Sequence, residues 1–222
     1  CVPVQPATAP AAAPTTAPDA ATDAYPVTVT DATNVTTTIP VPPQRVLTLT
    51  NLWDLDAVLS LGIAPVQFGI RAFVGQYPGS EQVSWQWHEE MLKQLNATAE
   101  RMNGDEPNLE VVALAKPDLI VGLPWHFENG RDAFAQLAPT IAVTTNWRDS
   151  LRIVGDAFAL RAKAEQIIAA TEERIATSLR DLNLGEKTVA VISCYDNTYF
   201  NGFGHEADGR ADLFQRAGFT LL

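Results

Sequence analysis

The sequence predicts an α/β fold built on a parallel sheet. Short apolar and β-branched runs alternate with helical patterns along most of the chain, and strands joined by helices pair in parallel with right-handed crossovers. The chain has 222 residues, of which 46% are hydrophobic and 18% charged. That composition is typical of a globular protein with enough length to bury a substantial core.

The first predicted elements lie between residues 25 and 70. Two β-like runs, 25–30 and 36–41, precede Pro42 and Pro43, which cannot donate to a sheet. A strand is expected over 45–50. Asn51 is the expected N-cap of a helix that ends at Gly62, because leucines and valines recur between them at helical spacing. Another strand is expected over 64–70.

The alternation resumes after a polar and aromatic stretch, 71–107, which contains one helical patch near 89–95. Asn108 is expected to cap a helix that runs through Lys116, followed by a strand over 118–122. A helix over 131–137 then leads to a strand over 140–144.

Residues 147 to about 184 are predicted to be helical, because they hold no proline and a single glycine, Gly155. Ala164, Ile168 and Ile175 give them an apolar stripe. This segment is either one more crossover helix or a rigid strut between two lobes. A strand over 187–194, a helix over 212–217 and the start of a strand at 219–222 follow. These last residues are too few to bury a core alone.

The first 24 residues differ from the rest, because 18 of them are Ala, Pro or Thr. Such a composition favours an extended, flexible spacer. Cys1 ahead of this spacer resembles the lipidated first residue of a processed bacterial lipoprotein, which a lipid anchor holds at a membrane outside the cytoplasm. The alternative is that the given sequence begins at a cysteine by chance.

Five segments, taken in order, resemble the substrate-binding proteins of iron–siderophore and cobalamin ABC importers. The most specific is PNLEVVALAKPDLIVG (107–122), in which a helix that begins with Asn-Leu-Glu ends at Lys-Pro-Asp before a strand. The others are the opening YPVTVTD…TTTIPVPPQRVLTLT (25–50), DAVLSLG (56–62), LAPT (137–140) and the long helix entered near Trp147.

The resemblance implies two α/β lobes joined by a rigid helix, with the ligand in the cleft between them. Accordingly we expect a linker over 1–24, an N-terminal lobe over 25–146, an interlobe helical segment over 147–186 and a partial C-terminal lobe over 187–222. Residues 187–222 are expected to supply only about half of the sheet that the family has in its second lobe, so a truncated form is expected. The family docks on its permease through one acidic residue per lobe, which corresponds here to Asp56 and Asp212, both shorter than the usual glutamate.

Ligands of parallel α/β folds lie beyond the carboxyl ends of the strands. A ferric siderophore is bulky and often anionic, so aromatic walls and arginine donors suit it. The candidate ligand-binding residues are Trp53, Arg71, Phe73, Trp125, His126, Tyr195 and Tyr199. The alternatives to ligand contact are a surface ion pair for Arg71, partial core burial for the tryptophans and a solvated loop position for His126.

Composition and motifs exclude several classes of function. The formal net charge is −11 without a basic cluster, which disfavours nucleic-acid binding, and no apolar stretch is long enough to cross a bilayer. No phosphate-binding loop, nucleophile elbow or zinc motif occurs. His205, Glu206 and Asp208 fit a polar loop better than a metal site. No catalytic residue, cofactor or resident metal is expected.

The sequence therefore predicts an extracytoplasmic, lipid-anchored protein that captures a ferric siderophore and delivers it to an ABC importer. It is not expected to be an enzyme or to bind nucleic acid. Two alternatives stay open: a binder of cobalamin or haem with the same fold, and a truncated remnant that does not transport.

Overall fold

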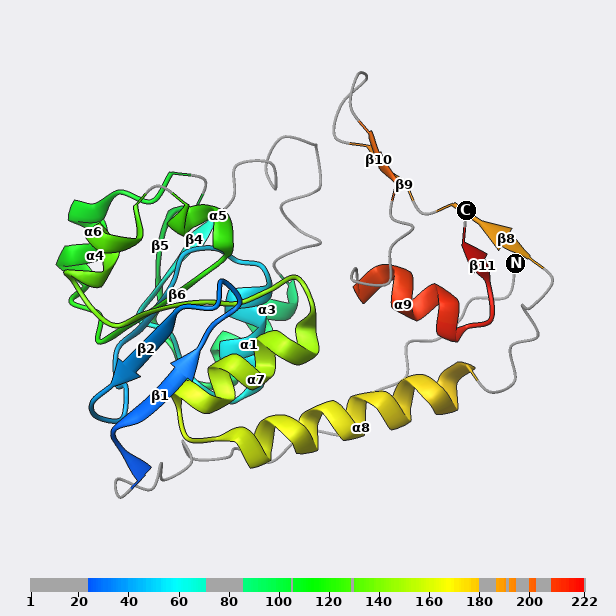
Figure 1. Ribbon diagram of the computed structural model, residues 1–222, viewed down its shortest axis with the longest axis horizontal. Helices are drawn as coiled ribbons and strands as arrows, with labels where there is room; N and C mark the ends of the chain where they lie inside the picture. The colour runs from blue at the N-terminus through cyan, green and yellow to red at the C-terminus, as the bar shows by residue number, and fades with distance from the viewer. Residues whose placement is uncertain are drawn as a thin grey trace.

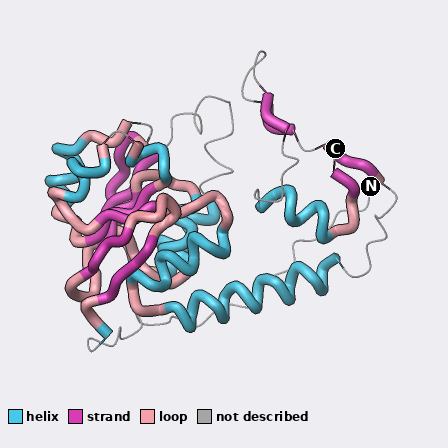
Figure 2. The backbone as a smooth tube through the Cα atoms, viewed as in Figure 1, coloured by secondary structure: helices cyan, strands magenta, loops and turns pink. Residues whose placement is uncertain are grey.

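The predicted α/β fold with a parallel sheet is confirmed. The computed structural model describes residues 24–70, 86–104, 106–128, 130–179, 187–190, 192–194, 200–202 and 209–221. Five parallel strands form the central sheet in the order β5-β4-β3-β6-β7, with helices on both faces (Figures 1 and 2). The strands are β3 (Val46–Thr48), β4 (Gln67–Ile70), β5 (Glu100–Asn103), β6 (Leu119–Gly122) and β7 (Thr140–Ala142).

Side chains of the central strands alternate between two hydrophobic clusters. In β6, Leu119 and Val121 belong to one cluster and Ile120 to the other. All three are fully buried, as is Leu47 of β3, which lies opposite Ile120 in the sheet register. Helices on both faces are what allow a strand to be apolar at every position.

One face of the sheet packs against α1 (Trp53–Ser60), α7 (Trp147–Ala157) and the hairpin of β1 (Val27–Thr30) and β2 (Thr36–Ile39). Helix α3 (Gln86–Gln94) covers the outer part of this side, where Met91 and Leu92 contact a small cluster around Phe68 of β4. The opposite face packs against α4 (Leu109–Ala115), α5 (Pro124–Phe127) and α6 (Arg131–Ala135).

Local signals explain where most helices begin and end. Gly62, at φ 76°, follows α1 as predicted. Asn108 caps α4, because its side chain accepts a hydrogen bond from the Glu110 N–H at 2.8 Å. The prediction that Asn51 caps α1 is wrong: Leu52 is the N-cap, without a side-chain cap bond, and Asp54 binds the preceding backbone instead.

The long helical segment is two helices rather than one. Helix α7 ends at Ala157 and α8 (Arg161–Leu179) begins four residues later. Ala159 takes a left-handed conformation at φ 53° between them. A Cβ atom at Gly155 would lie 2.9 Å from that of Ala164, so the glycine allows the two helices to approach closely. Helix α8 then extends beyond the sheet unit to pass beneath α9 (Figure 1).

From residue 187 onward, the residues that the structure describes form two short strand pairs and one helix. The predicted strand over 187–194 is instead two strands, β8 (Thr188–Val189) and β9 (Ile192–Cys194). Strand β8 pairs in parallel with β11 (Thr220–Leu221), and β9 pairs antiparallel with β10 (Phe200–Gly202). Helix α9 (Gly209–Arg216) begins three residues before its expected start and ends ahead of Gly218, which has φ 89°.

Candidate functional site

The sheet order places a topological switch point between β3 and β6. The chain leaves β3 toward β4 and β5, then returns to the other side through β6 and β7. Ligands of open α/β sheets bind at the carboxyl edge where the strand order reverses in this way. Figure 1 shows α1, α5 and α7 on the side of the sheet unit that faces α9.

A buried carboxylate organises the loop after β3. Asp54 is completely buried; its Oδ2 accepts a hydrogen bond from the Thr50 N–H at 2.7 Å, and its Oδ1 accepts from the Thr50 hydroxyl. Burial raises the pKa of Asp54, although the hydrogen bonds from Thr50 act in the opposite direction. These hydrogen bonds between Thr50 and Asp54 fix the start of α1, whose first residue is Trp53.

His126 links the loops that follow β5 and β6. Its Nδ1 accepts a hydrogen bond from the Leu123 N–H at 3.1 Å, and its Nε2 lies 3.1 Å from the Gly104 carbonyl oxygen. Because a carbonyl can only accept, Nε2 carries the proton and donates. The expectation of a solvated loop histidine is therefore wrong, since His126 lies in α5 and is half-buried with protein partners at both ring nitrogens.

Trp125 lies beside His126, with ring centroids 5.5 Å apart. Its side chain is 40% exposed, so a large aromatic surface is open to solvent at the carboxyl edge of the sheet. Such an exposed surface is what an aromatic ligand wall requires. Ligand contact by Trp53, Trp125 and His126 stays a prediction.

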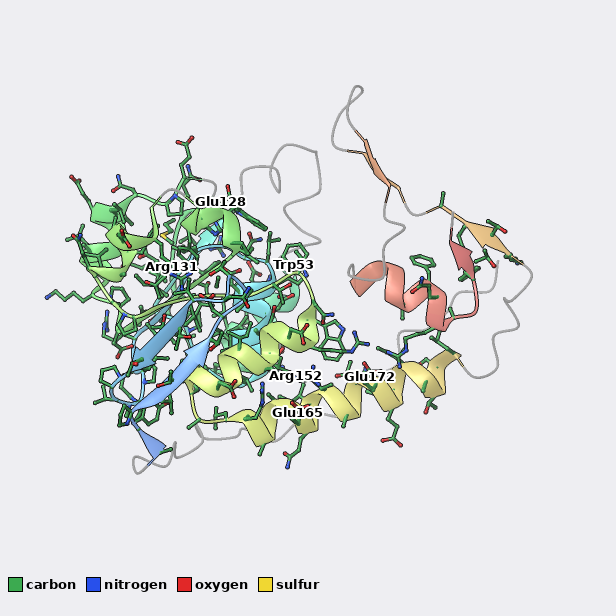
Figure 3. All side chains as sticks on the ribbon, viewed as in Figure 1. Trp53, Glu128, Arg131, Arg152, Glu165 and Glu172 are labelled. Atoms are coloured by element: carbon green, nitrogen blue, oxygen red, sulfur yellow. The ribbon has the colours of Figure 1, made fainter. Side chains whose placement is uncertain are left out.

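A groove of about 220 Å³ runs between α1, α7 and α8. Trp53 and Trp147 line it together with Leu151, while Asp56 and Ser60 supply polar groups. Figure 3 shows Trp53 on the side of the sheet unit that faces α9. Sequence reasoning did not select Trp147, although the rule that selected Trp53 and Trp125 also applies to the residues that follow β7.

Asp56, the predicted docking residue of the first lobe, contacts a histidine of another helix. His88 Nε2 lies 2.6 Å from Asp56 Oδ1. The Asp56 side chain is 49% exposed, whereas that of His88 is 8% exposed. Sequence reasoning did not find His88, because 32 residues separate the two and no local spacing connects them.

An ion cluster connects the sheet unit to the C-terminal part. Arg148 of α7 and Arg216 of α9 both pair with Glu172 of α8, whose position Figure 3 marks. Partial burial raises the pKa of Glu172, but hydrogen bonds from Arg216 and Arg148 outweigh it, so the pKa is lowered. Nearer the sheet, Arg152 of α7 donates to Glu165 of α8 at 2.9 and 3.2 Å.

Several predicted residues lie outside the described side chains. Asp212 lies in α9, but its side chain is not among the described ones. The remaining predicted site residues lie outside the described part of the chain: Cys1, Arg71, Phe73, Tyr195 and Tyr199.

Within the described residues, no three His, Cys, Asp or Glu side chains gather as a metal site. No described helix has both the length and the apolar character of a membrane span. The exposed ring of Trp125 and the groove walls of Trp53, Trp147 and Leu151 offer a ligand aromatic and apolar surface, a chemistry suited to an organic molecule.

The chain shares the fold of the two-lobed substrate-binding proteins. A periplasmic solute binding protein from Mycobacterium smegmatis MC2 155 matches with a TM-score of 0.70 and 28% identity, over 88% of this chain and 68% of that one. PiaA from Streptococcus pneumoniae TIGR4, solved in complex with ferrichrome, matches with a TM-score of 0.68 and 26% identity, over 88% and 67%.

Sequence comparison identifies relatives among siderophore-binding lipoproteins. The protein named "Probable siderophore-binding lipoprotein YfiY" of Bacillus subtilis strain 168 is 29% identical over 169 residues, which are 75% of this chain and 48% of the relative. The chain spans about half the length of the curated relatives that it matches. No family model matches the sequence. The relatives and the solved structures together confirm the predicted resemblance to siderophore-binding and ABC-transporter substrate-binding proteins.

Proposed function

We propose that this chain is an extracytoplasmic, lipid-anchored binding protein that captures a ferric siderophore and delivers it to an ABC importer. The observation that carries the proposal is the switch point between β3 and β6, flanked by Trp53 and Trp125, in a chain related to siderophore-binding lipoproteins. The ligand brings its iron already chelated, so the protein needs aromatic walls and hydrogen-bonding groups rather than metal ligands.

The proposal also assigns a role to each segment of the chain. Residues 25–146 form the N-terminal lobe, 147–186 the interlobe segment, 187–222 part of the C-terminal lobe, and 1–24 the linker that joins Cys1 and its lipid to the folded part. Trp53, Trp125 and His126 contact the ligand from the first lobe. Arg71, Phe73, Tyr195 and Tyr199 complete the ligand site. Asp56 and Asp212 dock on the permease, and the half-exposed side chain of Asp56 supports this role.

Intrinsic tryptophan fluorescence tests ligand capture. Ferric ferrichrome, titrated into the 222-residue chain, is expected to quench the emission saturably, since bound chromophoric iron lies close to Trp53 and Trp125. Metal-free ferrichrome is the matched control and is expected to quench less. The variants W53A and W125A are expected to bind about three- to tenfold more weakly, the loss of one aromatic contact.

Haem, cobalamin and a ferric catecholate are titrated in parallel. Saturation by cobalamin or haem alone would select the alternative binder with the same fold. If no ferric chelate, haem or cobalamin gives a saturable response, ligand capture by this chain is rejected.

A further inference from the structure

We propose that His126 is a positioning residue for Trp125 and makes ligand capture sensitive to pH: protonation of the His126 ring undoes the turn that presents Trp125, and the ligand is released in acid. The inference rests on the proposed function and deepens it, because it gives the ligand site a means of release.

Helix α5, which carries both residues, is too short to hold its shape alone. It consists of four residues, Pro124–Phe127, fewer than an isolated helix needs for stability in water. Phe127 anchors one end in the core, where its ring centroid lies 5.7 Å from that of Phe134. Trp125, in contrast, is 40% exposed. The direction of the Trp125 ring therefore depends on what fixes the turn around it.

The His126 ring fixes this turn through both of its nitrogens. Nδ1 accepts a hydrogen bond from the Leu123 N–H at 3.1 Å, which closes the first turn of α5. Nε2 donates to the Gly104 carbonyl oxygen at 3.1 Å. The ring also lies beside that of Trp125, with centroids 5.5 Å apart and planes tilted by 42°. One side chain thus joins the turn, the exposed indole and the loop after β5.

Gly104 is a fixed point at the carboxyl edge of the sheet. Its N–H donates to the carbonyl oxygen of Ile70 in β4 at 2.8 Å. A Cβ atom at this position would lie 3.0 Å from the carbonyl oxygen of Leu49, which follows β3, so the glycine backbone packs closely on the neighbouring strand ends. The hydrogen bond from His126 therefore ties α5 to the carboxyl ends of three strands.

The two hydrogen bonds together require the neutral ring. A neutral imidazole has one donor and one acceptor nitrogen, whereas the protonated ring has two donors and no acceptor. On protonation, the new N–H at Nδ1 points at the N–H of Leu123, a fully buried residue whose amide then loses its acceptor. A buried amide without an acceptor is unfavourable, so the ring turns away. Trp125 then loses the contact that sets its direction.

Histidine is the side chain whose ordinary pKa, about 6.5, lies between neutral and mildly acidic surroundings. Asp54 of α1 interacts electrostatically with His126, and burial raises the pKa of Asp54, so this carboxylate is the competing proton acceptor. Arg131 of α6 is paired with Asp31. Exposed carboxylates lie on the neighbouring segments, where water and salt screen their charge: Glu106, Glu110 and Glu128. Variants of His126 and Asp54 can separate the two proton acceptors.

Ligand binding at two pH values tests the proposal on the 222-residue chain. Ferric ferrichrome is titrated at about pH 7.5 and about pH 5.5, on either side of the ordinary histidine value, and quenching of tryptophan fluorescence gives the dissociation constant at each. We expect about three- to tenfold weaker binding at the lower pH, the loss of one aromatic contact. Any effect of pH on the chelate itself is common to all variants, so the ratio of the two constants is compared between each variant and the parent.

Two variants remove the titration and keep one hydrogen bond each. H126N retains an acceptor near Nδ1, and H126Q retains a donor near Nε2. Whatever their affinities at the higher pH, both should bind with nearly the same constant at the two pH values. W125A should also lose most of the pH dependence, because the effect of the proton passes through the indole ring. H88Q and H205Q alter the other two histidines and are the controls, which should keep the parental ratio.

Nuclear magnetic resonance follows the turn without a ligand. The amide signal of Leu123 and the indole N–H signal of Trp125 should shift together between the two pH values in the parent, and both should stay in place in H126N. This measurement separates the two proposals. Absence of ferrichrome binding at either pH rejects ligand capture, whereas the Leu123 and Trp125 signals still report whether the proton controls the turn.

A ratio near one in the parent, or a parental ratio in both H126N and H126Q, would overturn the proposal. Loss of the pH dependence in D54N, with its retention in H126N, would assign the proton to Asp54 and reject His126 as the acceptor. A Leu123 amide signal that does not move in the free parent would show that His126 does not control the turn. If circular dichroism shows that one His126 variant does not fold, the other makes the comparison.

Discussion

The sheet unit and the C-terminal part of this chain are held together in different ways. In the sheet unit, β3 and β6 lie between other strands, and helices bury their side chains on both faces. In the C-terminal part, β8 and β11 pair over two residues, and the helix next to them contributes Phe214, whose ring centroid lies 5.8 Å from that of Phe219. Among the described residues, most of the buried apolar packing therefore lies in the sheet unit.

The connection between the two regions has a different chemistry from either interior. Helix α8 contacts the sheet unit through Ala164 and Ile168, which are buried in the larger hydrophobic cluster. Farther along α8, the described contact with α9 is the pairing of Glu172 with Arg216. The order of the C-terminal part should therefore depend on charge, whereas the order of the sheet unit should depend on apolar packing.

Truncation of a central core residue should have the largest effect. Leu47 is fully buried in β3, so L47A is expected to lower the free energy of unfolding of the sheet unit by about 4 kcal/mol. F214A in α9 is the matched variant and should leave the main unfolding transition in place. Urea denaturation followed by circular dichroism measures both. Equal losses would mean that the two regions unfold as one unit.

Removal of a buried charge should cause the second-largest loss of unfolding free energy. Asp31 is fully buried and pairs with Arg131, and it accepts hydrogen bonds from Thr33 Oγ1 at 2.7 Å and the Ala142 N–H at 2.9 Å. These bonds tie the β1–β2 turn to β7. D31N is expected to destabilise the sheet unit by about 3 kcal/mol, because Arg131 and the amides lose an ionised acceptor. Denaturation at pH 7 measures the loss, with D132N as control.

The pH dependence of that loss has a definite sign. Burial raises the pKa of Asp31, but hydrogen bonds from Thr33, Arg131 and Ala142 outweigh it, so the pKa is lowered in the folded state. The stabilisation is therefore fully present above the unfolded pKa of about 3.9 and disappears as the pH falls through the folded value. The difference between the parent and D31N should shrink in acid. A difference that does not depend on pH would contradict the ion pair as its source.

The smallest expected effect lies at the ion cluster between the regions. E172Q should change the unfolding free energy of the sheet unit by about 1 kcal/mol or less, because these charges are partly exposed. Amide hydrogen exchange in α9 should accelerate several-fold, while exchange in α4 should not change. E173Q alters the exposed neighbouring residue and is the control. Unchanged exchange in α9 would show that other contacts hold this helix.

Strong local signals made much of the fold predictable. Asn108 and Gly62 mark helix ends by their own hydrogen bonding and backbone conformation, and both lie where they were expected. Strand β5 was missed because it is an edge strand, and Met102 alone of its four residues is buried. The turn at Ala159 was missed because a residue other than glycine takes the left-handed conformation, so no sequence signal marks it.

The site was less predictable than the fold. The rule of carboxyl strand ends selected Trp53 and Trp125, because a residue that follows a strand lies near the end of that strand. The contacts of His88 with Asp56 and of Glu172 with Arg216 join segments far apart in the chain. Partners of this kind depend on how helices pack, and the spacing of residues in the sequence does not encode it.

The corner at Ala159 gives helix α8 the geometry of a lever. Its 19 residues span about 28 Å at 1.5 Å per residue, so a rotation of about 10° at the corner would move the far end by about 5 Å. The small residues that meet there, Gly155 and Ala164, therefore determine the position of the distal end of α8. Replacing Gly155 with a bulkier residue would change the direction of α8 relative to α7, while the strands of the sheet would keep their positions.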